Sequence, residues 1–379
     1  MIKTNTYTYN EILQQPSVWL EVPELVEEKK SQLSHFLGEV QRSKDAEVIL
    51  TGAGSSYFVG EMVAPFFQQD TGLSSRAVET TEIVTNPTQY INKNRTTLLI
   101  SFARSGNSPE SVAAVNLANK VSKKIYHIII TCNAKGALNK VKGENVCSIV
   151  LPEEVNDKSL AMTSSVTSMA FTALSLGRLG QLDEMTMQLQ LASKLLRSKF
   201  EYLIQQVEQL GNTKYTRGIF LGSGAMKGVA HEAHLKLQEL TDGEIICKFD
   251  SFLGFRHGPK AVVNNEALIV YFFSNDEYTR QYEMDLVRQV ASGQNPILTI
   301  GICNEPMEPI GLDVKIELSG VRLEDAVWTV LSLVPAQMLA FYKSVALGYD
   351  PDSPSKSGAI HRVVRGVKIY DFSLNGNLS

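Results

Sequence analysis

Short apolar runs alternate with longer stretches of helical periodicity along most of the chain. After about residue 45, strand-length runs of Val, Ile and Leu are followed by Gly- or Ser-rich turns and then by apolar residues at helical spacing. This alternation predicts parallel strands joined by helices that cover both faces of a sheet. In the first half we predict strands at residues 48–50, 97–101, 126–131 and 147–151, and a closing helix at 163–179.

The same order of elements recurs in the second half. Gly52 and Gly222 open equivalent turns 170 residues apart, and the same offset separates Ile130 from Ile300 in the third strands. A constant offset across several landmarks indicates two copies of one unit. The second copy is predicted to have strands at 218–222, 267–272, 297–301 and 314–318, and a closing helix at 325–346.

The whole chain is therefore predicted to be an α/β fold made of two tandem doubly wound parallel-sheet units. We expect these units at 45–195 and 196–347, with an N-terminal helical arm at 1–44 and a C-terminal tail at 348–379 that contributes to the site. The arm is expected to pack on the body. A cleft between two such units is a natural place for a ligand.

Composition narrows the class of partner. Hydrophobic residues make up 44% and charged residues 20% of the chain, and the formal net charge is -4. These values are typical of a globular protein and argue against nucleic acid or an anionic membrane as the main partner. Residues 1–20 show no signal peptide, and no apolar run is expected to cross a bilayer. The four scattered cysteines, three of them in or beside apolar runs, favour reduced thiols and a cytoplasmic location.

A Ser-rich loop, Ser101–Ser111, is the sharpest local feature. It follows a buried strand and opens a helix at Ser108, so backbone N–H groups and the hydroxyls of Ser105 and Ser108 could hold an anion. The alternative is a capped loop that binds nothing. The matching loop of the second half, 273–277, carries two carboxylates that would repel phosphate, so one copy is predicted to be specialised for an anion.

Nucleotide-binding motifs are not supported. Both Gly-rich turns have a different residue, Tyr57 or Lys227, where the dinucleotide fingerprint needs its third glycine. No Gly-Lys-Ser/Thr sequence follows a glycine-rich loop, so a P-loop is excluded as well.

The second half contains an unusually polar helix and a polar turn. Glu232, Lys236 and Glu239 fall on one helix face, either as acid/base groups or as a solvated face with ion pairs. The two histidines of this helix, at 231 and 234, lack the spacing of a zinc peptidase, so we predict no metal site. His257 precedes Gly-Pro and is expected on an exposed turn.

Four motifs together resemble the sugar isomerase (SIS) family. They are Gly54-Ser55-Ser56-Tyr57, Ser105-Gly106-Asn107-Ser108, Leu235-Lys236-Leu237-Gln238-Glu239 and His257-Gly258-Pro259. The chain looks closest to the AgaS-type branch of tagatose-6-phosphate ketose/aldose isomerases and galactosamine-6-phosphate deaminases. It is also similar to the isomerase half of glucosamine-6-phosphate synthase, without the glutamine-hydrolysing domain.

The resemblance implies roles for particular residues. Phosphate binding falls on Ser56, Ser105 and Ser108, with Arg104 at a position usually held by Gln. The catalytic glutamate falls on Glu239, and the ring-opening histidine, supplied by a neighbouring subunit, on His257. Further substrate contacts are expected from Gly54, Ser55, Ala161, Ser164 and Lys236.

Two departures from the family pattern stand out. Ala103 replaces a hydroxyl residue that opens the phosphate motif, and Arg104 could compensate for it. The tail lysine of the synthase has no clear counterpart near Ala359, so Lys356 or His361 could take its place.

The resemblance implies a reaction on a hexose 6-phosphate without metal or cofactor. Galactosamine 6-phosphate giving tagatose 6-phosphate and ammonia is the expected reaction. A simple aldose/ketose isomerase and a non-catalytic sugar-phosphate sensor remain as alternatives. A homodimer or homotetramer with shared sites is expected, with no nucleic-acid or membrane partner.

Overall fold

The computed structural model describes residues 5–364 and 366–374, which group into two compact units. One unit holds the chain up to Leu20, Asp157–Thr167 and Asp183–Ile360; the other holds Glu21–Asn156, Ser168–Leu182 and the chain from His361 onward. Residues 1–4 of the predicted arm, and 365 and 375–379 of the predicted tail, lie outside the described residues. We call the units the second-sheet unit and the first-sheet unit, after the sheet that each contains.

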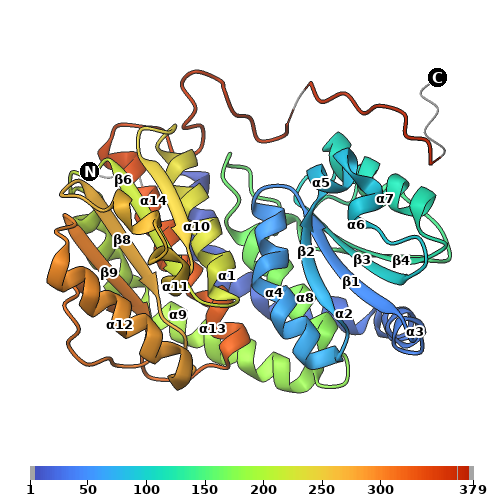
Figure 1. Ribbon diagram of the computed structural model, residues 1–379, viewed down its shortest axis with the longest axis horizontal. Helices are drawn as coiled ribbons and strands as arrows, with labels where there is room; N and C mark the ends of the chain where they lie inside the picture. Colours follow the sequence, from blue (N-terminus) through green and yellow to red (C-terminus); the bar gives the residue numbers. More distant parts are fainter. Residues whose placement is uncertain (1–4, 365, 375–379) are drawn as a thin grey trace. The chain divides into compact units, whose positions relative to one another are not determined.

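The first-sheet unit is built on five parallel strands, which are blue to green in Figure 1. In spatial order they are β2 (Ser75–Glu79), β1 (Ala46–Gly52), β3 (Thr96–Ala103), β4 (Lys124–Thr131) and β5 (Val146–Val150). The central strand β3 is buried along its whole length, which explains its continuous apolar run.

Helices cover both faces of this sheet. One face packs against α5 (Thr80–Thr85), α6 (Pro87–Tyr90) and α7 (Pro109–Val121), and the other against α3 (Lys30–Gln41) and α4 (Ser55–Thr71). The helix α2 (Val22–Glu27) contacts β5, and the 3-10 turns η2 (Leu138–Lys140) and η3 (Glu153–Val155) lie in loops.

The second-sheet unit repeats the arrangement. Its five parallel strands are, in spatial order, β7 (Ile246–Asp250), β6 (Arg217–Gly222), β8 (Ala267–Phe272), β9 (Leu298–Cys303) and β10 (Val314–Glu317). On one face lie α11 (Phe252–Phe255), η4 (Pro259–Val262) and α12 (Glu277–Gly293). On the other face lie α10 (Met226–Leu240) and α14 (Leu333–Ala346), with α13 (Asp325–Leu331) beside them.

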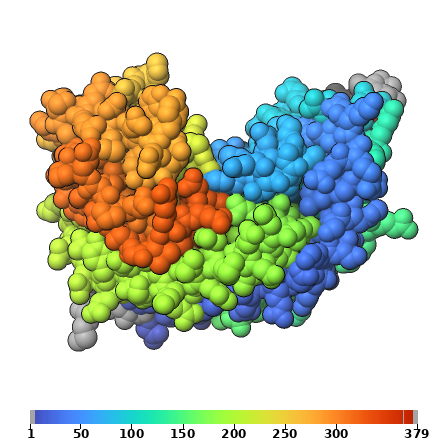
Figure 2. All heavy atoms as spheres, turned by 90° about the horizontal axis from the view of Figure 1, so that it is seen from below, coloured from blue at the N-terminus to red at the C-terminus, as the bar shows by residue number. Residues whose placement is uncertain are grey.

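Three further helical segments complete the chain. The long helix α9 (Leu182–Gly211), yellow-green in Figure 2, reaches the orange segment that starts α13, where the Glu324 N–H donates to Gln188 Oε1 at 3.3 Å. The helix α8 (Ser164–Gly177) precedes α9 in the chain. The arm begins with α1 (Tyr7–Val18), which packs on α14 as expected, followed by η1 (Trp19–Glu21).

The predicted duplication is confirmed in the backbone. The two sheets have the same strand order, and both glycine turns have nearly the same positive φ, 55° at Gly54 and 56° at Gly224. A Cβ on Gly52 would lie 2.5 Å from the carbonyl oxygen of Ser56, and one on Gly222 would lie 2.1 Å from that of Met226. Only glycine lets each strand turn this tightly into its helix.

Three details differ from the sequence-based expectations. Strands β2 and β7 were not predicted, and the helical arm expected at 1–44 is divided into α1, η1, α2 and α3. The stretch Asp325–Ala346 is long and apolar enough to span a membrane, whereas we expected no apolar run of that length. Its most apolar window is 94% buried inside the protein, as a core helix would be. Cys132, Cys147 and Cys303 are buried free thiols, as predicted.

Candidate functional site

The candidate residues fall into two groups, one in each unit, and each group is described by itself. In the first-sheet unit the strand order changes direction between β1 and β3, because one crossover runs to β2 and the other to β3. Loops at such a switch point diverge and leave a crevice at the carboxyl ends of the strands. The two predicted phosphate motifs are the loops that follow β1 and β3.

The first of these loops leads directly into α4. Ser55 and Ser56 are the first two residues of that helix, where N–H groups lack helical partners, and each is only 5% exposed. The tight turn at Gly52 and Gly54 places this helix start beside the end of the strand. The position suits an anion, because the positive end of the helix dipole points at the same crevice.

The second loop is shaped by Gly106 and by a polar side chain from the next loop along the sheet. Gly106 has φ of 62°, and Asn133 Nδ2 donates to the Ser105 carbonyl at 2.8 Å. Ser108 is the N-cap residue of α7, yet its side chain makes no capping hydrogen bond within the described part of the chain. Its hydroxyl is therefore not committed to the helix that it begins.

Arg104 lies at the end of β3 and is 6% exposed. One of its guanidinium nitrogens, Nη2, donates to the carbonyl of Arg362 at 2.8 Å, and Arg362 Nη2 donates to Asn156 Oδ1 at 2.8 Å. The tail therefore returns to this strand end, and it brings the exposed His361 with it. No sequence motif marks Arg362, so its contact with Arg104 could not be predicted.

The equivalent crevice of the second sheet contains a carboxylate of the chain itself. Glu283, on α12, is fully buried, and its Oε2 accepts a hydrogen bond from the Ser274 N–H at 3.0 Å. Burial raises the pKa of this carboxyl group to about 7, although hydrogen bonding to Ser274 and Ser223 lowers it in part. Ser223 and Ser274 belong to the loops after β6 and β8, so a buried carboxyl group of the chain lies at this switch point. The two copies therefore differ at their switch points, and the specialisation of the first copy for an anion stays a prediction.

An ion-paired cluster lies on α10. The Lys236 ammonium is 1% exposed and lies 2.5 Å from Glu239 Oε2 and 3.4 Å from Glu232 Oε1. Glu232 is fully buried, whereas the Glu239 side chain is 23% exposed. The three residues of this helix face thus form ion pairs, but the pairs lie in the protein interior rather than on a solvated face. Glu239 also lies at the end of α10 remote from the glycine turn that begins it.

His257 lies on a different side of the second sheet. It is exposed, as predicted, in the turn between α11 and η4, and Gly258 has φ of 113°. The apolar residues of α11 and η4 pack on the face opposite to the one that α10 covers. The body of the sheet therefore separates His257 from Glu239 of the same chain.

The segment 157–165 is organised by Asp157. This buried carboxylate accepts hydrogen bonds from the N–H groups of Thr163, Ser164 and Ser165 at 2.8, 3.2 and 3.0 Å, and it caps the start of α8. The Ser164 hydroxyl donates to Asp157 at 2.5 Å and accepts from Gln14 at 3.0 Å. Ser164 and Ala161 are fully buried, so a contact of either with substrate stays a prediction.

Lys356 lies beside the turn that follows Glu239. Its backbone N–H donates to Asp242 Oδ2 at 3.1 Å, and its ammonium lies 3.9 Å from the centre of the Tyr349 ring. The Tyr349 hydroxyl in turn donates to Glu244 Oε2 at 3.0 Å. The tail thus reaches the end of α10, although the Lys356 ammonium lies on an aromatic ring.

The residues described include no group of three or more His, Cys, Asp or Glu side chains arranged to hold a metal ion. The two histidines of α10 pack on an aromatic side chain instead. His231 stacks on Phe249 with ring centres 3.5 Å apart, and His234 lies 5.1 Å from the same ring.

Known proteins resemble the chain over nearly its whole length. The SIS domain family model matches residues 42–176 and 213–345. The chain is 39% identical to the D-galactosamine-6-phosphate deaminase AgaS of Escherichia coli O157:H7, over 97% of this chain and 96% of that protein. The crystal structure of tagatose-6-phosphate ketose/aldose isomerase from Escherichia coli matches with a TM-score of 0.88 and 36% identity, covering 98% of each chain.

A more distant relative shares only part of its length. The glutamine–fructose-6-phosphate aminotransferase of Idiomarina loihiensis is 24% identical over 82% of this chain and 51% of its own length.

Proposed function

The chain belongs to the SIS domain family, and on that premise we propose that it is an amino-sugar-phosphate deaminase. The proposed reaction converts galactosamine 6-phosphate and water into tagatose 6-phosphate and ammonia. Support comes from the nearly full-length similarity to a protein named for this deaminase activity. The observation that carries the proposal is the partly exposed Glu239 carboxylate held at 2.5 Å by a buried ammonium.

Glu239 is the proposed base. Once the sugar ring is open, its carboxylate takes the proton from C2 and returns a proton to C1, through an enolamine. The product is an imine at C2, which water attacks; ammonia leaves and the ketose remains. Lys236 supports this role because its ammonium fixes the direction of the carboxylate, and its expected contact with the substrate stays a prediction.

Substrate anchoring is assigned to the crevice of the first sheet. We propose that Ser56, Ser105 and Ser108 hold the phosphate, with Arg104 supplying positive charge. Gly54 and Ser55 would line the same crevice. Binding the phosphate far from the reacting carbons orients the sugar and lowers the barrier that the chemistry must overcome. Lys356 and His361 are candidates for the tail's contribution, at the end of α10 and at the end of β3 respectively.

His257 is proposed to open the ring in the site of a neighbouring subunit, by protonating the ring oxygen. Its exposure and its position on the sheet face opposite to α10 support this assignment. The protein would then function as a homodimer or homotetramer with shared sites. Four free cysteines agree with action in the reducing cytoplasm.

The reaction is tested by incubating the purified protein with galactosamine 6-phosphate. We expect ammonia release at the same rate as tagatose 6-phosphate appears in the ¹H-NMR spectrum. In deuterated water, deuterium should enter at C1. Galactose 6-phosphate serves as the comparison substrate. If it is isomerised while the amino sugar releases no ammonia, the protein is a plain aldose/ketose isomerase.

The Glu239→Gln variant separates an enzyme from a sugar-phosphate sensor. Loss of the base should lower kcat at least about 10²-fold, the usual weight of general-base catalysis, while sugar-phosphate binding is retained. A sensor would instead bind hexose 6-phosphates without turnover, and the substitution would leave its affinity nearly unchanged. The matched control is Glu201→Gln, which changes an exposed carboxylate on α9, outside the proposed site.

A further inference from the structure

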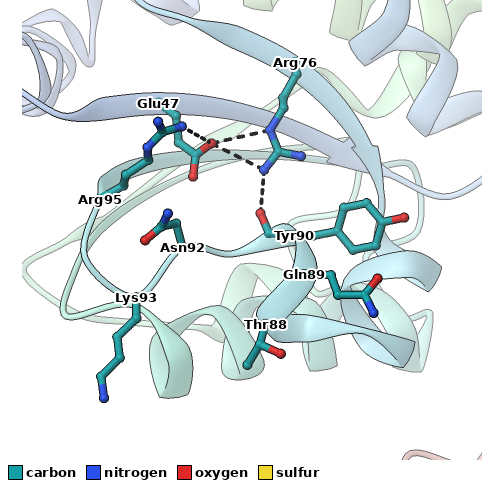
Figure 3. A pocket seen from close by; sticks show the side chains of 8 residues that line it. All are labelled: Glu47, Arg76, Thr88, Gln89, Tyr90, Asn92, Lys93 and Arg95. Atoms are coloured by element: carbon teal, nitrogen blue, oxygen red, sulfur yellow. Dashed lines mark hydrogen bonds and ion pairs between the residues drawn. The ribbon is translucent and has the colours of Figure 1, made fainter.

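A polar pocket lies in the first-sheet unit, away from the Ser-rich loop (Figure 3). Its volume is about 410 Å³, within the range of roughly 300–1,000 Å³ usual for small-molecule sites. Apart from the Tyr90 ring, the side chains that line it are polar or charged. They are Glu47, Arg76, Thr88, Gln89, Tyr90, Asn92, Lys93 and Arg95.

The pocket lies at the amino-terminal edge of the sheet. Glu47 and Arg76 are the second residues of β1 and β2, and Arg95 directly precedes β3. The Ser-rich loop follows the other end of β3. An eight-residue strand rises about 3.3 Å per residue, so the pocket and that loop are roughly 25 Å apart. The pocket is therefore separate from the proposed phosphate crevice.

Glu47 is the buried acceptor of the pocket. It is 3% exposed, and its Oε2 forms ion pairs with Arg76 Nη2 at 3.3 Å and Arg95 Nη1 at 3.7 Å. Its other oxygen, Oε1, has no hydrogen-bond partner among residues 5–364 and 366–374. Figure 3 shows the Glu47 carboxylate between the side chains of Arg76 and Arg95, with the Asn92 side chain beside it. A buried carboxylate oxygen without a donor is costly, so this position suits a ligand that supplies one.

The cations of the pocket exceed its single carboxylate. Three positive side chains, Arg76, Lys93 and Arg95, line the pocket with the one carboxylate of Glu47, and Arg95 Nε also pairs with Asp45 Oδ1, outside the lining, at 2.8 Å. Both arginine side chains are 42% exposed, and each guanidinium carries five N–H donors, of which the ion pairs with Glu47 and Asp45 use only some. Arg76 also donates to the Tyr90 carbonyl at 2.5 Å, which fixes the plane of its guanidinium. Planar, pre-positioned guanidinium groups are well suited to phosphate oxygens.

We propose that this pocket is a second ligand site for a small hydroxylated or aminated phosphate monoester, distinct from the site of the reaction. The phosphate binds to Arg76, Lys93 and Arg95, and a hydroxyl or ammonium of the ligand donates to Glu47 Oε1. The nearly complete lack of apolar lining excludes a nucleobase or an acyl chain as the preferred occupant. A sugar phosphate bound there can act as an effector, because β1 and β3 connect this edge of the sheet to the two loops of the crevice.

Calorimetric titration with galactitol 6-phosphate tests the site, because this polyol has no carbonyl group and cannot be isomerised. Lys93→Glu reverses an exposed charge of the pocket, and the same reversal at the exposed Lys142, outside the pocket, is the matched control. We expect Lys93→Glu to weaken one binding event by roughly tenfold or more and Lys142→Glu to leave it unchanged. Equal binding by both variants and wild type overturns the proposal.

A second variant tests the role of Glu47 independently of folding losses. Glu47→Gln keeps the shape of the side chain but removes its charge, so inorganic phosphate should bind more tightly. Galactitol 6-phosphate should gain less affinity than inorganic phosphate, because its hydroxyl group loses a charged acceptor. If both ligands gain equally, Glu47 does not contact the ligand and the proposal is wrong. These readouts are binding measurements, so failure of the deaminase assay would not affect them.

Discussion

Lys236 carries an ammonium group into the interior, between two carboxylates of its own helix. The Glu232 and Glu239 positions, four residues before and three after, are those that meet on a helix surface, so their spacing in the sequence was sufficient to predict the contact. Burial could not be predicted in the same way, because it depends on the packing of α14 over α10. Lys236 therefore has two separable roles: it neutralises a buried carboxylate and it orients an exposed one.

The first prediction separates these two roles. Lys236→Met removes the ammonium from the buried Glu232 and should lower the free energy of unfolding by about 3–5 kcal/mol, the usual cost of breaking a buried pair. Adding Glu232→Gln removes the charge left behind, so the double variant should recover most of that stability. Its kcat should stay low, because Glu239 still lacks its partner. Chemical denaturation and the ammonia assay measure the two effects. Recovery of kcat together with stability would mean that Lys236 has no positioning role.

Glu283 gives the second prediction, on the dependence of stability on pH. Burial raises its pKa from 4.5 to about 7, so the folded state favours the protonated form. The contribution of this pKa shift to the free energy of unfolding is fully present below pH 4.5 and is lost as the pH rises towards 7. The total is about 3 kcal/mol at 1.36 kcal/mol per pKa unit. Relative to wild type, Glu283→Gln should therefore gain stability progressively between pH 4.5 and 7. A constant difference in unfolding free energy across that range would contradict the assignment.

His127 gives a prediction of the opposite sign. This fully buried residue of β4 has Nε2 2.9 Å from Asn119 Oδ1, and desolvation lowers its pKa from 6.5 to about 4. The folded state therefore favours neutral imidazole. The contribution of this pKa shift to the free energy of unfolding is fully present above pH 6.5 and is lost as the pH falls towards 4. His127→Gln should lose less stability than wild type on acidification through that range. Parallel urea titrations of both variants at several pH values check the two signs against each other.

Among the secondary-structure elements, the strands with continuous apolar runs were predicted and two edge strands were not. In β2 only Val78 is buried, and β7 has no buried residue, so neither shows the run that marks a central strand. Both nevertheless pair in register with their neighbours, β1 and β6, through backbone hydrogen bonds that any side chain permits. The repeat offset could not reveal them either, because β2 and β7 are equivalent in the two copies and neither copy shows an apolar run there.

The strand-to-helix turn after β1 carries the fourth prediction. In Gly52→Ala the new Cβ would lie 2.4 and 2.5 Å from backbone atoms of Ser56, which cannot move without displacing the start of α4. We expect a loss of about 3 kcal/mol or more, the upper range for overpacking, and weaker phosphate binding. Gly180→Ala, at a turn with nothing within 4 Å of the new Cβ, is the matched control and should be within about 0.5 kcal/mol of wild type. Thermal unfolding and phosphate titration compare them, and similar results for the two variants would show that the turn tolerates a side chain.

At the scale of the whole molecule, the position of His257 has consequences for assembly. Glu239 lies on the helix covering one face of the second sheet, and His257 lies in the segment covering the other. If both groups act on one sugar, the histidine of that site belongs to another copy of the chain. The motifs identified both residues, but their separation within one chain follows only from the sheet topology, which alternates helices between the two faces.

The last prediction is therefore complementation between two inactive variants. Glu239→Gln lacks the base but keeps His257, and His257→Ala lacks the histidine but keeps Glu239. In a symmetric dimer made from equal amounts of both, half of the dimers are mixed, and each mixed dimer has one intact site and one doubly impaired site. Random assembly should restore about a quarter of wild-type activity in the unfractionated mixture and about half in the isolated mixed dimer. The variants, carrying different affinity tags, are co-expressed and the mixed species is isolated for the ammonia assay. Activity no higher than that of the separate variants would contradict the shared site. It would show that each site takes Glu239 and His257 from one chain, or that His257 takes no part in the reaction. If His257 takes no part, the His257→Ala variant alone is fully active.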